Sequence, residues 1–281
     1  MTGRLAIIAG SGGLAAALVA ALAKRPMVAA LEGFLPEGLV PDQVFRIERL
    51  MPFLNALRDA GIAQVIFAGA VQRPRLDPAL FDPLTAQMVP RMLTAIQGGD
   101  DATLRVVIEL FEESGLRVVG VADVAPDLVP GEAVLCGKPS AADTRDAARA
   151  AVIVAALGAV DVGQAAVVAQ GLCLAVEALP GTDAMLDFVA QTAARPDPAR
   201  PRGVLWKAPK PGQDWRVDLP TLGVETVRRA AAAGLAGIAW QAGGVILLDR
   251  AAMVAARRSR ALMSASRRYR RRPCGPWPGR W

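Results

Sequence analysis

Residues 5–18 read LAIIAGSGGLAAAL, and this stretch decides the fold class expected for the first half of the chain. The apolar run Leu5–Ala9 predicts a buried strand, and Leu14–Ala23 has the apolar density of a helix. Between them, Gly10-Ser11-Gly12-Gly13-Leu14-Ala15 matches the G-x-G-x-x-G/A pattern of dinucleotide-binding turns. Glycines in such a turn let the backbone approach a phosphate, and the helix that follows offers free N–H groups. The stretch therefore predicts a Rossmann-like unit with an anion site at its first turn.

The identity of that anion stays open at this point. Glu32 follows Gly10 by 22 residues, near the end of the next predicted strand, where an NAD(P)-binding oxidoreductase holds the ribose. A tight strand-to-helix turn without any ligand is the structural alternative, because the pattern is short and the chain is rich in Ala and Gly.

Strands and helices continue to alternate after this loop, which favours a parallel sheet covered by helices on both faces. Asp100 or Asp101 is expected to cap a helix over Ala102–Ser114. The other elements expected in this half are strands at Met27–Gly33 and Gln64–Ala70 and helices at Phe45–Ala60 and Thr85–Ile96.

Prolines and glycines between Leu128 and Ala142 predict a domain boundary. The expected division is a Rossmann-like domain over 1–130, a linker over 131–142, a mixed α/β catalytic domain over 143–256 and an atypical tail over 257–281. In the second domain we expect two strands around a turn at Gly171, and a helix with Thr182 as its N-cap. A hairpin or two short strands are expected to meet at Gly243-Gly244.

The composition excludes several classes of site. The 281 residues include no His, which removes Ser-His-Asp hydrolysis, Cys-His proteolysis and every His-ligated metal site. A metal would then be a hard ion on oxygen ligands, such as Mg²⁺. Three widely spaced Cys form no metal or disulfide pattern. No apolar run approaches the roughly 20 residues of a membrane span, so a cytoplasmic protein is expected.

The basic charge of the chain is confined to its last residues. Residues 257–281 hold nine Arg and no acidic residue, so the net charge of +6 becomes −3 for residues 1–256. The body of the protein is therefore mildly acidic, and no nucleic-acid partner is expected. The tail has no apolar periodicity, and we expect it to be disordered. Contact with an anionic membrane and an out-of-frame terminus are the alternatives.

The stretch Lys207–Gly223, KAPKPGQDWRVDLPTLG, is the richest in chemistry-bearing residues. It combines Lys207, Lys210 and Arg216 with Asp214 and Asp218, on a path that three prolines stiffen. Cations neutralise phosphate oxygens, and a carboxylate can hold Mg²⁺ or orient water, so the stretch suits phosphoryl chemistry. A surface loop with solvated ion pairs is the alternative.

Five motifs together give the chain a family resemblance. IAGSGGL, FAGAVQRP, GGDDATLR, VDVGQAAVVAQGLCLAVEALPGTDAML and KAPKPGQDWRVDLPTLGVETVRRAAAAGLAGI occur in this order between about residues 5 and 252. In this order they resemble the LpxI-type UDP-2,3-diacylglucosamine pyrophosphatases. The tail after about Ala256 departs from that resemblance.

The resemblance implies a cytoplasmic enzyme of lipid A biosynthesis, with peripheral contact to the inner membrane as a further expectation. The reaction it implies is Mg²⁺-assisted hydrolysis of UDP-2,3-diacylglucosamine to 2,3-diacylglucosamine 1-phosphate and UMP, with the substrate between two domains. Asp218 matches the family's essential aspartate, and the metal ligands stay open. An NAD(P)-dependent oxidoreductase and a non-catalytic binder of nucleotide sugar or lipid are the alternative functions. The expected substrate-binding residues are Gly10, Ser11, Gly12, Gly69, Ala70, Asp100, Asp101, Gly171, Thr182, Asp183, Lys207, Lys210, Gln213 and Arg216.

Overall fold

The computed structural model describes residues 3–72, 75–97, 100–192, 197, 202–256 and 262–266. It is an α/β structure that divides into two compact units. Unit 1 consists of the described residues of 1–129, 212–221 and 246–249, and unit 2 consists of those of 130–211, 222–245 and 250–281. The units therefore differ from the linear division expected from the sequence, because two short segments of the second half belong to unit 1.

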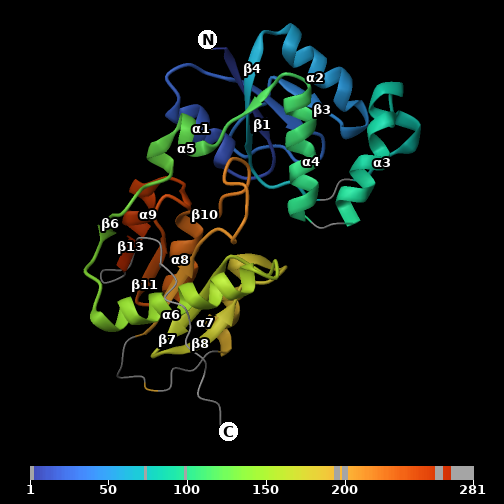
Figure 1. Ribbon diagram of the computed structural model, residues 1–281. Coiled ribbons are helices and arrows are strands. Elements are labelled where there is room, and N and C mark those ends of the chain that lie inside the picture. Colours follow the sequence, from blue (N-terminus) through green and yellow to red (C-terminus); the bar gives the residue numbers. More distant parts are fainter. Residues whose placement is uncertain are drawn as a thin grey trace. The chain divides into compact units, whose positions relative to one another are not determined.

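Unit 1 is built on a five-stranded parallel sheet with the order β3-β2-β1-β4-β5 (Figure 1). This confirms the predicted Rossmann-like sheet. The strands are β1 (Arg4–Ala9), β2 (Met27–Leu31), β3 (Gln43–Phe45), β4 (Ile62–Ala68) and β5 (Arg117–Val118). The helices are α1 (Leu14–Ala21), α2 (Leu50–Asp59), α3 (Pro83–Gln97), α4 (Asp100–Glu113) and α5 (Val121–Val124), with 3₁₀ turns at Ile47–Arg49, Pro78–Leu80 and Pro126–Leu128.

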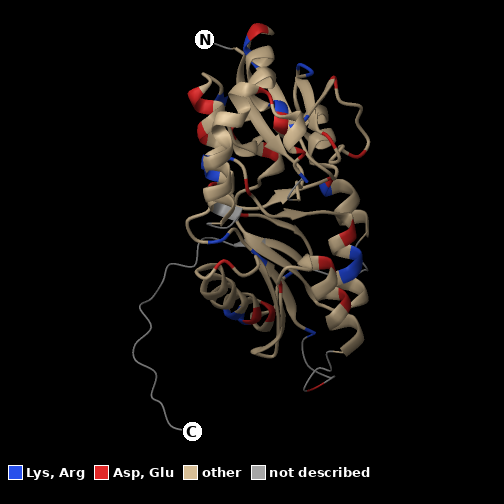
Figure 2. Cartoon of the chain, turned by 90° about the vertical axis from the view of Figure 1, so that its right-hand side faces the viewer, with Lys and Arg blue, Asp and Glu red and all other residues tan. Residues whose placement is uncertain are grey.

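The sheet of unit 1 separates two hydrophobic clusters. Along β1, Ala6 and Ile8 join one cluster with α2 and α4, and Ile7 and Ala9 join the other with α1 and α5. This alternation follows from the two-residue period of a strand, and it explains why β1 is apolar at nearly every position. Figure 2 shows the charged residues mainly on helices and loops, while the strands are mostly free of them.

Unit 2 has a six-stranded mixed sheet with the order β6-β13-β11-β9-β7-β8, which confirms the mixed α/β class expected for the second half. Strands β9, β11 and β13 are parallel, and β6, β7 and β8 are antiparallel to their neighbours. The strands are β6 (Val134–Cys136), β7 (Ala165–Ala169), β8 (Leu172–Val176), β9 (Val204–Lys207), β11 (Gly237–Gln241) and β13 (Leu262–Ser266).

One long helix, α6 (Ala141–Gly158), packs its small apolar residues against β7, β9 and β11. Ser140 begins α6 with a capping box, in which its hydroxyl and the Asp143 carboxylate satisfy each other's backbone N–H groups. The other helices of unit 2, α7 (Gly181–Thr192), α8 (Val224–Ala232) and α9 (Arg250–Ala256), contact one another in chain order, and α8 contacts β11.

Three expectations for the second half need correction or refinement. Gly243-Gly244 does not join a hairpin: β11 pairs with β9 and β13, while β12 (Ile246–Leu247) pairs with β10 (Thr221–Leu222), so the alternative of two short strands is the right one. Thr182 is not an N-cap, because α7 begins at Gly181 and includes it. The predicted disordered tail contains β13, which adds a parallel strand beside β11; the rest of residues 257–281 lies outside the described residues.

No helix in the described part of the chain is long and apolar enough to cross a membrane.

Candidate active site

The segment Gly212–Thr221 carries Asp218 and belongs to unit 1. Two alternate side chains anchor it there: Val217 packs against the cluster of α2 and α4, and Leu219 packs against the cluster of α1 and α5. The end of the segment is fixed as well, since Ile246 N–H donates to the Pro220 carbonyl at 2.9 Å. Asp218 lies between the two anchors, so the hydrophobic core of unit 1 holds this carboxylate in place.

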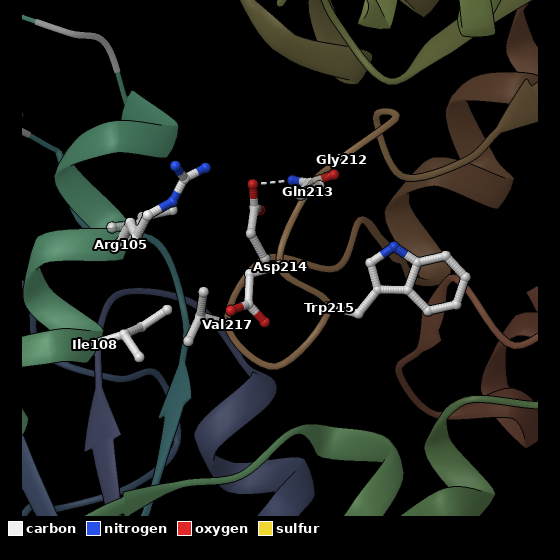
Figure 3. Close-up of a pocket in the computed structure, with 9 residues that line it drawn as sticks. Arg105, Ile108, Gly212, Gln213, Asp214, Trp215 and Val217 are labelled. Atoms are coloured by element: carbon white, nitrogen blue, oxygen red, sulfur yellow. Dashed lines mark hydrogen bonds between the residues drawn. The ribbon is translucent and has the colours of Figure 1, made fainter. Parts of the chain in front are cut away.

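A cavity of about 370 Å³ opens beside this segment, within unit 1 (Figure 3). One wall is the first half of α4, and the other is the loop that ends at Asp218. The residues that line it are Leu104, Arg105, Ile108, Gly212, Gln213, Asp214, Trp215, Val217 and Asp218. The same loop approaches the chain after β5, where a Cβ built on Gly120 would lie 3.2 Å from Arg216 Cα. The cavity therefore lies near a carboxyl end of the parallel sheet, where open α/β folds bind ligands.

Asp214 organises the loop through both its backbone and its side chain. Its carbonyl accepts the N–H groups of Val217 and Asp218, and its carboxylate accepts the N–H of Arg216 at 3.0 Å. The Arg216 guanidinium donates hydrogen bonds to the same carboxylate and to Glu112 on α4, the latter at 2.8 Å. This hydrogen-bonded pairing with Arg216 lowers the pKa of Asp214 and, in return, raises the pKa of Arg216. Arg216 thus joins the loop to α4 and is occupied by two carboxylates.

Asp218 accepts a hydrogen bond from the side-chain amide of Gln213. Gln213 is itself buried, so the loop holds both partners on the cavity wall. The structure thus brings together three of the predicted site residues, Gln213, Arg216 and Asp218, on one loop.

The predicted residues of the two glycine-containing loops also lie close together, but their backbone groups form hydrogen bonds mainly with one another. Gly10 N–H donates to the Ala68 carbonyl, and Ser11 and Ala70 exchange two backbone hydrogen bonds of 2.9 Å. A Cβ on Gly10 would lie 2.5 Å from the Ala70 carbonyl oxygen, so glycine is required where these two loops meet. Gly12 accepts a hydrogen bond from Glu37 N–H.

The dinucleotide interpretation of this loop gains little from the structure. The N–H groups of Gly10 and Ser11 are already bonded to carbonyls, so only the start of α1 is left to meet an anion. There Gly13 is the N-cap, and no side chain of the described residues caps the helix. Glu32, expected to hold a ribose, accepts a hydrogen bond from Arg46 at 3.1 Å.

A second polar cluster lies in unit 2, around Lys207 at the end of β9. Lys207 is buried, with 7% of its surface exposed, and its ammonium donates to the Thr182 hydroxyl at 2.6 Å. Thr182 in turn donates to Glu177 at 2.9 Å. Burial lowers the pKa of Lys207, and the charges of Glu177 and Asp183 partly offset this effect. Lys207 and Thr182, two of the predicted binding residues, therefore lie in one hydrogen-bond network that joins β9 to the first turn of α7.

The remaining predicted residues have structural partners or undescribed side chains. Gly171 N–H donates to the buried carboxylate of Asp146 at 2.8 Å, Lys210 pairs with Asp161, and Asp183 faces Arg229 at 3.5 Å. Asp100 and Asp101 are the first residues of α4, which begins two residues before the predicted Ala102, and their side chains lie outside the described residues.

The carboxylates of the loop could bind a metal ion that needs only one or two protein ligands. Within the described residues, no group of three or more His, Cys, Asp or Glu side chains is placed to hold a metal ion by itself. Mg²⁺ commonly needs only one or two carboxylates, since substrate phosphates and water complete its shell. Asp218 and Asp214 supply oxygen ligands of that kind on the cavity wall, and Asp218 is the better candidate because Asp214 is bound to Arg216.

Sequence reasoning missed Arg105 as a site residue. It lies in the quoted motif GGDDATLR, but 113 positions separate it from Asp218, and only the packing of α4 brings it to the same cavity. Asp214 was grouped with the phosphoryl-type residues of its stretch, and its role in shaping the loop became clear only from its hydrogen bonds.

Comparison with known proteins gives the family. Residues 4–128 match the model of the LpxI N-terminal domain, and residues 131–263 match the model of the LpxI C-terminal domain. A curated protein of Caulobacter vibrioides, named UDP-2,3-diacylglucosamine pyrophosphatase LpxI, is 40% identical over 262 residues, which are 90% of this chain and 93% of that protein. The chain belongs to the LpxI family.

The LpxI match confirms the resemblance found in the sequence and corrects its extent. It reaches residue 263, beyond Ala256, and therefore includes the first residues of β13. The two LpxI models meet between residues 128 and 131, where the chain first passes from unit 1 to unit 2.

Proposed function

We propose that this protein hydrolyses the pyrophosphate bond of UDP-2,3-diacylglucosamine, giving 2,3-diacylglucosamine 1-phosphate and UMP, as a cytoplasmic step of lipid A biosynthesis. The observation that carries the proposal is the 40% identity over nearly the whole chain to a protein named for this pyrophosphatase activity. Water supplies one new P–O bond, the P–O–P bridge breaks, and two phosphate monoesters leave. The reaction needs no redox partner.

Asp218 is the residue to which we assign the chemistry. Its carboxylate lies on the cavity wall, with Gln213 as a hydrogen-bond donor and Asp214 shaping the loop around it. A carboxylate in this position can hold a metal ion or accept a proton from the attacking water. Gln213 orients the carboxylate, so one of its oxygens stays directed to the reacting group.

We propose Mg²⁺ as the cofactor, with Asp218 as its first protein ligand. When bound, such an ion neutralises charge on phosphate oxygens and lowers the pKa of water. The residues of the chain then have simpler tasks: Asp218 binds the ion or the water, and cationic side chains bind the pyrophosphate. Within unit 1, we assign a substrate-binding role to Gly12, which lies just before α1.

The diacyl portion of the substrate implies a supply from a lipid surface. We propose transient contact with the inner membrane, without an anchored segment. Flotation with vesicles containing anionic phospholipid, with and without the UDP-linked lipid, tests this part separately from catalysis.

The experiment that tests the function is direct. Purified protein is incubated with UDP-2,3-diacylglucosamine and Mg²⁺, and UMP and the lipid phosphate are measured over time. Asp218→Asn should lower turnover by about 10³-fold or more while leaving the thermal transition intact. Running the reaction in ¹⁸O-labelled water tests the expectation that the sugar-side phosphate is attacked, because the label would then enter the lipid phosphate and not UMP.

A matched control separates the chemistry from folding. Asp127 lies in the 3₁₀ turn of unit 1 and does not line the cavity, so Asp127→Asn should keep normal turnover. Release of no UMP by the wild-type protein, together with binding of the intact lipid, would support a non-catalytic binder instead. A change of NADH fluorescence on mixing, without hydrolysis, would support the oxidoreductase alternative.

A further inference from the structure

Arg105 directs its guanidinium into the same cavity as Asp218. The side chain extends from α4 across the cavity toward the loop of Gln213 and Asp214 (Figure 3). It is exposed, and its charge contributes to the lowered pKa of Asp214. Among the described residues it has neither a hydrogen bond nor an ion pair, whereas Arg216 beside it is held by Asp214 and Glu112. The donors of Arg105 are therefore available to a ligand.

Arg91 helps to leave the guanidinium of Arg105 without a partner on α4. Glu109 is four residues after Arg105 on α4, a spacing at which opposite charges can pair on the helix surface. Arg91 of α3 binds Glu109 at 2.5 Å and Glu113 at 2.9 Å. These pairings raise the pKa of Arg91, which stays fully protonated. Arg91 of α3 thus occupies Glu109 and Glu113, two of the Glu side chains that follow Arg105 on α4.

The charges of the cavity agree with an anionic ligand at this point. The wall carries one cation, Arg105, and two carboxylates, Asp214 and Asp218. Arg216 neutralises Asp214 from outside the lining, so the remaining pair of a carboxylate and a guanidinium faces the same space. A guanidinium suits phosphate because it presents parallel N–H groups to two oxygens at once.

We propose that Arg105 is a catalytic residue that binds the non-bridging oxygens of the scissile pyrophosphate and neutralises the charge that develops there. This inference rests on the proposed pyrophosphatase function. Asp218 on the loop and Arg105 on α4 would then hold the reacting group from two walls of one cavity. Because the guanidinium is bidentate, lysine should replace it only in part.

Kinetics of three variants test the proposal. Arg105→Gln should lower kcat/KM by about 10²- to 10³-fold, as loss of a donor to a developing oxyanion does. Arg105→Lys should recover part of that loss. Arg58→Gln is the matched control, because Arg58 is also exposed, lies on α2 of the same unit and does not line the cavity, and its side chain has no hydrogen-bond or ion-pair partner among the described residues. It should match the wild type.

A binding measurement supplies a readout that does not depend on turnover. In the Asp218→Asn background, calorimetric titration with intact UDP-2,3-diacylglucosamine should show affinity at least tenfold weaker when Arg105→Gln is added. If the wild type releases UMP but Arg105→Gln keeps wild-type kcat, KM and affinity, the role of Arg105 is overturned and the proposed function stands.

Failure of the proposed pyrophosphatase function gives a different result from failure of the role of Arg105. If the wild type releases no UMP, the pyrophosphatase function is wrong, and titration of the wild type and Arg105→Gln with inorganic pyrophosphate decides the remaining question. Weaker binding by the variant keeps Arg105 as a phosphate ligand, and equal binding removes it.

Discussion

Arg216 holds both carboxylate oxygens of Asp214: its Nε lies 3.1 Å from Oδ1 and 3.2 Å from Oδ2, and its Nη2 lies 2.7 Å from Oδ2. The two residues are only two positions apart, so the pair closes the turn that delivers Asp218 to the cavity wall. The position of the Asp218 carboxylate therefore depends on the Asp214–Arg216 pair, which takes no direct part in the proposed reaction.

Asp214→Asn should lower kcat by about 10- to 100-fold, because the amide cannot keep the ionic grip of Arg216 and the loop shifts. The folded fraction should change little, since both side chains are partly exposed to water. Steady-state kinetics and a thermal melt measure the two effects. Asp42→Asn is the control: Asp42 also accepts a backbone N–H and pairs with an arginine, Arg25, but does not line the cavity. Equal activity losses in both variants would contradict the positioning role.

Arg91→Gln should reduce turnover by a few-fold although Arg91 does not line the cavity. Removing Arg91 frees Glu109, which can then pair with Arg105 along α4 and compete with the substrate. The double variant Arg91→Gln/Glu109→Gln should regain wild-type kcat/KM. A loss that the second substitution does not restore would show that Arg91 acts through the stability of the α3–α4 pair instead.

Lys207→Met should change how stability depends on pH. Burial places the pKa of Lys207 in the folded protein below the value of 10.5 in the unfolded chain. Between these two pKa values the unfolded chain binds more protons, so the wild-type free energy of unfolding gains a rising contribution as pH increases. The variant lacks that contribution. Urea titrations at pH 7 and pH 9.5 should therefore show the wild type gaining stability relative to Lys207→Met, and a constant difference would contradict the lowered pKa.

Gly69→Ala should destabilise the protein by about 1–3 kcal/mol. Gly69 has φ +111°, and a Cβ there would lie 2.6 Å from the Gly10 carbonyl oxygen. Gly13→Ala is the matched control in the same loop region, because nothing lies within 4 Å of its Cβ position and its φ is −87°. Chemical denaturation of both variants measures the difference. Similar stability of the two variants would mean that the loops of Gly10 and Gly69 can move apart at little cost in free energy.

The sequence predicted the parts of the fold that depend on local pattern. The strand at Leu5–Ala9 and the helix after it follow from apolar periodicity, and they appear as β1 and α1 within a few residues. Strand β13 could not be predicted in the same way, because Leu262–Ser266 is short, has arginines on both sides in the sequence and forms a strand by pairing with β11 and β6. Its apolar contribution is visible in Met263, which is buried.

The candidate site was predictable where one stretch of chain contains it. Gln213, Arg216 and Asp218 lie within six residues; the charged residues of that stretch indicated Arg216 and Asp218, and Gln213 was among the expected binding residues. Arg105 could not be joined to them, since its place depends on how α4 packs on a sheet formed by other residues. The glycine pattern predicts a close approach of the backbone to a phosphate, and this stays a prediction; the structure shows a close approach of Gly10 to the backbone of Ala70.

The discontinuous make-up of unit 1 also has a consequence for biosynthesis on the ribosome. Val217, Leu219 and Ile246 fill the hydrophobic clusters of a sheet whose strands end by residue 118. A nascent chain of 129 residues therefore has all five strands but lacks side chains that close its interior. Unit 1 can finish folding only after most of unit 2 has been synthesised, so the two units complete their folding together. A fragment truncated near residue 130, where the two LpxI domain models meet, lacks these core side chains.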